Sequence, residues 1–224
     1  AQVCLDRFRK LKAADVQADR DRRSQYDDLE EVQTQVAQTY TRMGIMYAQH
    51  RDLNSAEQLW KRAAELDPHH VECRSNLARL YQQTRQTQKA LSLCEDLAAL
   101  EPGNGAHPFN MGMIHANLRQ FDAALKAFEK ARKLAPEQSA SYRLLAQMIL
   151  ETGRDIDQAW AYAQQAVTLE ARAENYFVLG AVKIKQGDSA GAAAALQQAL
   201  RLEPSNPKYL SAFQAFQKRL QQEN

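Results

Sequence analysis

Residues 37–70 read AQTYTRMGIMYAQHRDLNSAEQLWKRAAELDPHH, and their pattern returns every 34 residues along most of the 224-residue chain. A glycine or alanine recurs with this period at Gly44, Ala78, Gly112, Ala146 and Gly180, each directly after a leucine or methionine. A second small residue follows twelve or thirteen positions later, at Ala56, Ala90, Ala124, Ala159 and Ala192. A fixed period of this length predicts an array of stacked units that bury their cores against one another, so that function lies on a surface.

Each unit carries the pattern of two amphipathic helices. In the first unit Tyr40, Gly44 and Tyr47 are spaced by four and three residues, which places them on one helical face. Ala56 and Trp60 begin a second face after a short break, and an Asp-Pro pair near the end of the unit stops that helix. We therefore predict one helical hairpin per unit, with the small residues where its two helices approach closely.

These spacings resemble the tetratricopeptide repeat, whose pattern is an aromatic residue, Leu-Gly, Tyr, Ala, an aromatic residue, Ala and Pro. The first unit matches at Tyr40, Met43, Gly44, Tyr47, Ala56, Trp60, Ala63 and Pro68, the third at Met111, Gly112, Ala124, Phe128, Ala131 and Pro136, and the fifth at Tyr176, Leu179, Gly180, Ala192, Leu196, Ala199 and Pro204. The resemblance implies an all-α fold, a right-handed superhelical α-solenoid of antiparallel helix hairpins. It divides residues 37–206 into five units, at 37–70, 71–104, 105–138, 139–172 and 173–206.

Two further segments flank these units. Residues 1–36 are expected to form a charged helical extension, since residues 15–31 are dense in both signs of charge. Cys4, Phe8 and Leu11 have the spacing of a second helix, so the segment is also interpreted as the remnant of an earlier unit, or as an interaction arm. Residues 207–224 keep the phase for half a unit and are predicted to be a capping helix. Leu210 and Phe213 stand at the expected buried places, and Phe216 and Leu220 extend this apolar stripe.

Composition and motifs argue against catalysis and against polyanionic partners. Lys and Arg number 29 and Asp and Glu number 27, and the resulting net charge of +2 is too balanced to suggest nucleic acid or a membrane surface. No apolar run approaches the ~20 residues of a membrane span, so we predict no membrane insertion. The sequence also lacks phosphate-binding loops, serine-nucleophile turns and the His or Cys spacings of metal sites. We therefore predict that the protein is not an enzyme and has no catalytic residue, no cofactor and no metal site.

The three cysteines bear on the compartment. Their spacing is not that of a zinc site, and Cys73 and Cys94 fall too far apart on antiparallel helices to form a disulfide. We expect free thiols, which favour a cytoplasmic location without assigning one. Because the chain begins at Ala1 rather than at methionine, we interpret it as a processed or excised form, and secretion or a periplasmic location stays open.

The resemblance also implies a concave groove, lined by the first helix of each unit, that binds a peptide. Ten residues are predicted to contact it: Asn76, Arg79, Phe109, Asn110, Met113, Arg143, Leu144, Gln147, Phe177 and Val178. Asn76 and Asn110 stand at equivalent places, which resembles the asparagine ladder of some members of the family, although chance is an alternative. Five of the later residues are apolar and suggest a docking site for a hydrophobic helix or strand, unless they pack against one another or against the cap. They are Phe109, Met113, Leu144, Phe177 and Val178.

The main functional hypothesis is a non-enzymatic scaffold that binds a peptide or protein segment in this groove. One alternative is an interaction module of a larger, enzymatic or secreted polypeptide, and another is an array that self-associates. A clamp for the carboxylate tail of Hsp70 or Hsp90 is predicted against, because Asn76 matches one of its five places and Thr41, Ile45, Ala106 and Asn110 stand at the others. The sequence assigns neither the partner nor the oligomeric state.

Overall fold

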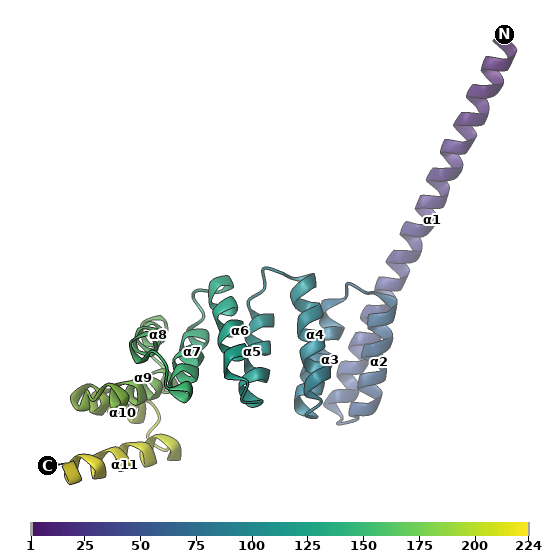
Figure 1. Cartoon of the computed structure of the whole chain (residues 1–224). Coiled ribbons are helices and arrows are strands. Elements are labelled where there is room, and N and C mark those ends of the chain that lie inside the picture. Colours follow the sequence, from purple (N-terminus) through teal and green to yellow (C-terminus); the bar gives the residue numbers. More distant parts are fainter. Residues whose placement is uncertain (1, 224) are drawn as a thin grey trace. The chain divides into compact units, whose positions relative to one another are not determined.

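The described part of the chain folds into α-helices joined by short turns. The computed structural model describes the backbone of residues 2–223 and the side chains of residues 12–21 and 28–222, so the side chains of Cys4, Phe8 and Leu11 lie outside the described residues. Eleven helices occupy the described part of the chain (Figure 1): α1 (Gln2–Gln49), α2 (Leu53–Leu66), α3 (Val71–Gln83), α4 (Thr87–Leu100), α5 (Ala106–Asn117), α6 (Phe121–Leu134), α7 (Ser139–Thr152), α8 (Ile156–Leu169), α9 (Ala173–Gln186), α10 (Ser189–Leu202) and α11 (Pro207–Glu223). The predicted all-α fold is confirmed.

The helices are organised as hairpins within two compact units. In the unit Ala1–Leu93, α2 packs beside the C-terminal part of α1 (Figure 1), and α3 packs against α2. In the unit Cys94–Asn224, three hairpins follow one another, namely α5–α6, α7–α8 and α9–α10, and α11 packs against α10. Consecutive helices are thus packed in pairs, as in an α-solenoid of helix hairpins.

Helix α1 is longer than a repeat requires. It runs without interruption for 48 residues, about 70 Å at the rise of an α-helix, so no helix end marks the predicted boundary at residue 37. By contrast, α3, α5, α7, α9 and α11 begin within one residue of the positions 71, 105, 139, 173 and 207 at which the 34-residue phase starts a unit.

The turn inside each hairpin has one residue in the left-handed conformation. These residues are 34 positions apart and have φ values of 64°, 59°, 57°, 66° and 78° at Arg51, Arg85, Arg119, Gly153 and Gly187. Glycine adopts this conformation without steric cost, whereas arginine is strained there. In α2, α8 and α10 the second helix then begins with a capping aspartate: for example, the Asp188 carboxylate accepts a hydrogen bond from the Gly191 backbone N–H at 2.8 Å.

Small residues of the first helix make room for large residues of the second. A Cβ atom on the glycine would lie 2.5 Å, 2.6 Å and 2.8 Å from the nearest side-chain atom of the partner in the pairs Gly44–Trp60, Gly112–Phe128 and Gly180–Leu196. In α7–α8 the glycine is replaced by Ala146, and the residue at the partner position is the small Ala163. The predicted close approach is therefore between glycine and a bulky side chain, not between two small residues.

The prediction for the buried residues of the cap is wrong at Leu210 and correct at Phe216. Tyr209 and Phe216 are the buried aromatic residues of α11, whereas Leu210 is 44% exposed and Phe213 is half-buried. The Tyr209 ring packs against α9, which turns the next residue about 100° around the helix toward solvent.

Other sequence predictions concern single residues and membrane spans. Cys73 and Cys94 are buried free thiols, as predicted. None of the helices in the described residues combines the length and apolar character of a membrane span. Among the described side chains there is also no group of three His, Cys, Asp or Glu residues that could hold a metal ion.

Candidate functional site

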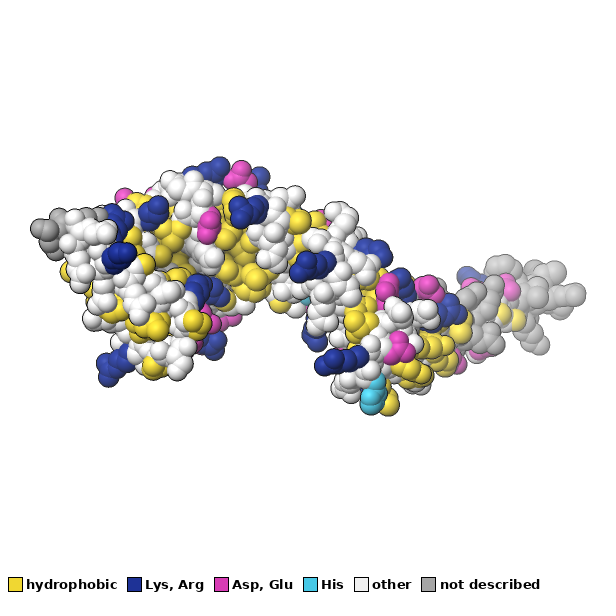
Figure 2. Space-filling view, turned by 90° about the horizontal axis from the view of Figure 1, so that it is seen from below, with side chains coloured by type: hydrophobic (Ala, Val, Ile, Leu, Met, Phe, Trp, Pro, Cys, Tyr) yellow, Lys and Arg dark blue, Asp and Glu magenta, His cyan; other side chains and the backbone are white. Residues whose placement is uncertain are grey.

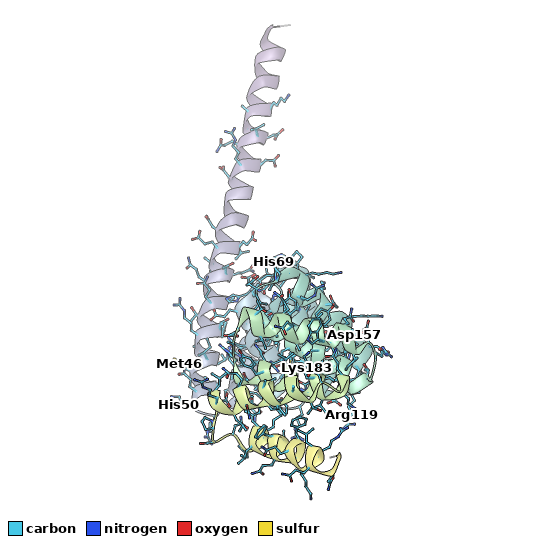
Figure 3. The ribbon with its side chains drawn as sticks, turned by 90° about the vertical axis from the view of Figure 1, so that its left-hand side faces the viewer. Met46, His50, His69, Arg119, Asp157 and Lys183 are labelled. Carbon is cyan, nitrogen blue, oxygen red and sulfur yellow. The ribbon has the colours of Figure 1, made fainter. Side chains whose placement is uncertain are left out.

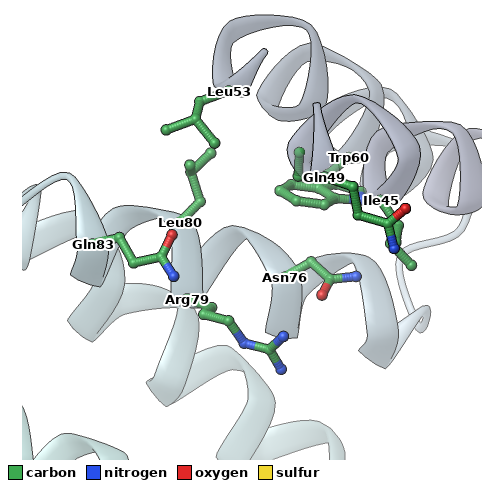
Figure 4. Close-up of a pocket in the computed structure, with 9 residues that line it drawn as sticks. Ile45, Gln49, Leu53, Trp60, Asn76, Arg79, Leu80 and Gln83 are labelled. Atoms are coloured by element: carbon green, nitrogen blue, oxygen red, sulfur yellow. The ribbon is translucent and has the colours of Figure 1, made fainter. Parts of the chain in front are cut away.

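The first candidate site is a pocket between α1 and α3 in the unit Ala1–Leu93 (Figure 4). It has a volume of about 310 Å³. Four polar and five apolar residues line it: Gln49, Asn76, Arg79, Gln83, Ile45, Ala48, Leu53, Trp60 and Leu80. None of these nine residues carries a carboxylate, so the polar part of the lining is rich in N–H donors.

Trp60 forms a rigid apolar wall of this pocket. Its side chain is 4% exposed, and its Nε1 donates a hydrogen bond to the Thr41 carbonyl oxygen at 3.1 Å. Gly44 leaves the space that the indole ring occupies. At the adjacent turn the Asp52 carboxylate caps α2 by accepting a hydrogen bond from the Ser55 backbone N–H at 3.1 Å. The wall is therefore positioned by contacts within the α1–α2 hairpin.

A network of polar groups ties α2 to α3, the helix that carries the polar side of the pocket. The Tyr81 hydroxyl donates to the Glu57 carboxylate at 2.8 Å, and Lys61 pairs with the same carboxylate at 2.5 Å. The hydrogen bond from Lys61 is the main cause that lowers the pKa of Glu57, so this carboxylate stays ionised at neutral pH. The two helices are thus joined across their interface by a charged hydrogen bond.

Asn76 is the lining residue whose hydrogen bonding is incomplete. Its Nδ2 atom is buried and has no hydrogen-bond partner. A buried donor without an acceptor costs roughly 1–3 kcal/mol, a cost that an oxygen atom of a ligand would remove. Arg79 follows about one helical turn later on α3 and is exposed, and its guanidinium group lies at the same side of the pocket (Figure 4).

A second pocket, of about 380 Å³, lies between α5 and α7 in the unit Cys94–Asn224. It is lined by Met113, Ala116, Asn117, Arg119, Phe121, Leu144, Gln147, Met148 and Glu151. All of these except Arg119 stand two 34-residue periods after a residue that lines the first pocket. The repeat therefore builds the same pocket twice, with different side chains.

The substitutions between the two pockets change their chemistry. Leu144 stands in place of Asn76, so the unpaired amide becomes an apolar side chain. Gln147 stands in place of Arg79, which removes the cation on that helix. The second pocket takes its cation from the turn, at Arg119, and has the Glu151 carboxylate in place of Gln83. The first pocket has neither a carboxylate nor an apolar side chain at the Asn76 position, and this is how the two differ.

Half of the predicted site residues line these pockets. Asn76 and Arg79 line the first, and Met113, Leu144 and Gln147 line the second. Phe109, Asn110 and Arg143 are absent from both linings: Phe109 packs edge-on against Phe128 with ring centroids 5.7 Å apart, Asn110 is exposed, and Arg143 is half-buried. Asn76 and Asn110 belong to different compact units, and the asparagine ladder stays a prediction.

The structure contradicts the predicted docking role of Val178, which is buried, and Phe177 packs against the cap, which is the alternative that the sequence left open. Val178 is 5% exposed and belongs to a core cluster with Leu179 and Val182. The Phe177 ring lies 5.1 Å from the Tyr209 ring of α11, centroid to centroid. These two residues are apolar because they form packing contacts, in one case with the cap.

Sequence reasoning missed the contribution of the turns to both pockets. Leu53 and Phe121 occupy the same position, two residues after the left-handed residue of the turn, and each lines its pocket. Arg119 is itself such a left-handed residue. The available signal was the 34-residue phase of the turns, which places an apolar residue just after the break between the two helices.

Comparisons with known proteins agree with this architecture. Three family models, each described as tetratricopeptide repeat, match residues 47–107, 109–138 and 173–206, together more than half of the chain. A search of curated proteins found no match. Among solved structures, PilF of Pseudomonas aeruginosa is similar with a TM-score of 0.70 and 18% identity, over 84% of this chain and 86% of that one.

Two further solved structures are comparably similar. MamA of Desulfovibrio magneticus RS-1 has a TM-score of 0.67 and 19% identity, over 76% of this chain and 97% of its own. YrrB, described as a TPR protein with an unusual peptide-binding site, has a TM-score of 0.64 and 17% identity, over 77% of this chain and 89% of its own. At these identities the likeness shows the fold alone.

Proposed function

Because this chain belongs to the tetratricopeptide repeat family, we propose that it is a non-enzymatic scaffold that binds an extended peptide segment through the pocket between α1 and α3. The family and the fold neighbours support a protein–protein interaction module. The peptide-binding role and the site are our inference. They rest on the chemistry of the pocket and on its recurrence in the second compact unit.

The observation that carries the proposal is the unpaired Nδ2 of Asn76. A buried N–H donor without an acceptor destabilises the free protein. Binding of a partner that supplies the acceptor removes this unfavourable free energy and so contributes to affinity. The carbonyl oxygens of an extended peptide are such acceptors at every residue. An amide can therefore hold the main chain without reading the peptide sequence.

Specificity would come from the other lining residues. Arg79 gives the first pocket a positive charge, so a peptide with an acidic side chain at this point is favoured over a basic one. The second pocket, with Met113, Phe121 and Leu144, would accept an apolar side chain. The two pockets thus select different residue types, each within its own compact unit.

The test starts from peptides selected from a random displayed library on the full chain. Affinities are then measured by titration calorimetry for the parent chain, Asn76→Leu and Arg79→Ala. Each substitution removes a hydrogen-bond donor, and Arg79→Ala also removes a charge, so we expect a loss of roughly tenfold or more in affinity. Arg62→Ala on the exposed surface of α2 is the matched control and should leave affinity unchanged.

Asn76→Leu has a second, opposite effect that makes the test specific. It places at this position the residue type found in the second pocket and removes the unsatisfied donor, so the free energy of unfolding should rise by roughly 1 kcal/mol or more. A gain in stability combined with a loss of peptide affinity would support a binding role for Asn76. Selected peptides that bind Asn76→Leu and Arg79→Ala as tightly as the parent chain would overturn the proposed site.

A further inference from the structure

Helix α1 carries an exposed apolar stripe that its own unit does not cover. The stripe consists of Leu29, Val32, Val36, Met43 and Met46, which are between 39% and 60% exposed. Hydrophobic side chains reach the surface at this end of the first unit (Figure 2), and Met46 projects outward from the end of α1 (Figure 3). The helix buries a different face against its hairpin partner, through Ala37, Thr41 and Gly44.

The later units show what the equivalent face of their first helices contacts. Met43 and Met46 have eight equivalents at 34-residue steps, and all except the half-buried Met111 are at most 8% exposed: Leu77, Leu145, Leu179, Leu80, Ile114, Met148 and Val182. The first helix of a unit packs there against the unit before it, as the contacts of α3 with α2, of α7 with α6 and of α9 with α8 show. The stripe on α1 is therefore an inter-unit face, and among the described residues no helix packs against it.

We propose that the α1 stripe is covered by the α1 helix of a second copy of this chain, with the two helices antiparallel. Leu29, Val36 and Met43 are seven residues apart. Val32 and Met46 each follow one of them by three residues, at Leu29 and Met43 respectively. This is the a and d pattern of a two-helix seam, interrupted only by Thr39. A second α1 brings the same stripe at the same length, so one self-complementary contact covers both copies.

The long N-terminal part of α1 also supports pairing with a second helix. Every described side chain before Thr34 is exposed, so this part of the helix is not stabilised by packing on its own unit. Helices without tertiary contacts are marginally stable in water, and an identical helix alongside would supply those contacts.

The charges along one edge of the stripe select the antiparallel orientation. Asp28 and Glu31 lie at its N-terminal end, and Arg42 lies near its C-terminal end on the same side. Antiparallel pairing places the acidic end of each helix beside Arg42 of the other, and it does so twice by symmetry. Parallel pairing would instead place this edge beside the opposite edge of the partner's stripe, where Gln33 and Tyr40 carry no charge, so neither attraction would form. This inference is independent of the proposed peptide pocket, which lies on another face of α1.

The experiment measures the mass of the full chain by light scattering over a wide range of concentrations. We expect a rise from monomer to dimer, and at least a tenfold weaker dimer for Val36→Glu. Gln38→Glu is the matched control, because it adds the same charge to an exposed position of α1 outside the stripe. Circular dichroism at a concentration low enough for all three chains to be monomeric should show equal helicity. A monomer at every concentration, or a dimer that Val36→Glu does not weaken, would overturn the proposal and leave the stripe to a different protein.

Charge reversal and spin labels test the orientation. Arg42→Glu should weaken the dimer, and mixing it with Asp28→Lys/Glu31→Lys should restore association between the two variants. In a Cys4→Ser background, labels on Val36→Cys should lie close together across the dimer, whereas labels on Leu29→Cys should lie much farther apart. Equal label separations would indicate parallel pairing and overturn the antiparallel proposal.

Discussion

A methyl group added at Gly112 tests the packing rule of the hairpins. Its Cβ would lie 2.6 Å from Cε1 and 2.7 Å from Cδ1 of Phe128, whose side chain is fully buried and has no room to move. Overpacking of this kind costs about 1–3 kcal/mol. Replacing a helical glycine with alanine gains about 1 kcal/mol of helix propensity. We therefore expect Gly112→Ala to lower the free energy of unfolding by about 1 kcal/mol.

The effect of Gly112→Ala on the free energy of unfolding should change sign when the Phe128 ring is removed. In a Phe128→Ala background the clash is gone and only the propensity gain remains, so Gly112→Ala should then raise the free energy of unfolding by about 1 kcal/mol. Ala146 and Ala163 already provide this combination in α7–α8. The coupling energy between the two substitutions is therefore expected to be about 2 kcal/mol.

Urea unfolding followed by circular dichroism measures these differences. Gly103→Ala is the control, because nothing lies within 4 Å of the added Cβ and its φ is ordinary, and it should change stability by less than about 0.5 kcal/mol. The reasoning would be refuted if Gly112→Ala stabilised the parent chain, or if its effect were the same with and without the Phe128 ring.

Three further predictions rest on other features of the chain. Arg85 has a φ of 59°, so Arg85→Gly should raise the free energy of unfolding by roughly 0.5–1 kcal/mol while Arg85→Ala should not, and equal melting temperatures for the two would contradict this. Burial raises the pKa of the Cys94 thiol from 9.0 to about 11, so the unfolded chain loses this proton first and stability should fall as the pH rises between these two values. Urea titrations of the parent chain and of Cys94→Ala at several pH values measure that fall, which should be smaller in the variant. The Tyr162 hydroxyl donates to Glu129, so Tyr162→Phe should lower the free energy of unfolding by about 1–3 kcal/mol, and a loss of the same size in a Glu129→Gln background would show that this bond is not the cause.

Most of the fold follows from the phase of the repeat. The positions of Gly44, Gly112 and Gly180, together with the prolines, predict where each hairpin begins, because helix period and helix breakers act over a few residues. The phase does not predict the length of α1. No breaker separates residues 1–36 from the first unit, so propagation of the helix continues through the predicted boundary at residue 37.

The candidate site was predicted in part. Asn76, Arg79, Met113, Leu144 and Gln147 were selected because the phase places them on the inner side of a first helix, and each lines a pocket. The phase of the repeat did not predict which of the selected side chains are buried. The ring of Phe177 is covered by Tyr209, a residue of another helix, and the alternation of helix faces along α9 contains no information about that neighbour.

The sequence by itself determined the unit, the hairpin and the register, since these depend on contacts between residues close in the chain or exactly one period apart. The tertiary structure decided which faces are occupied. It showed that Asn76 keeps a donor unpaired, that Phe177 and Val178 belong to packing contacts, and that the stripe on α1 has the composition of an inter-unit face but no covering helix in the described residues. The physical reason is that exposure depends on which helix lies opposite a side chain, and that is a property of the assembled array rather than of any one repeat.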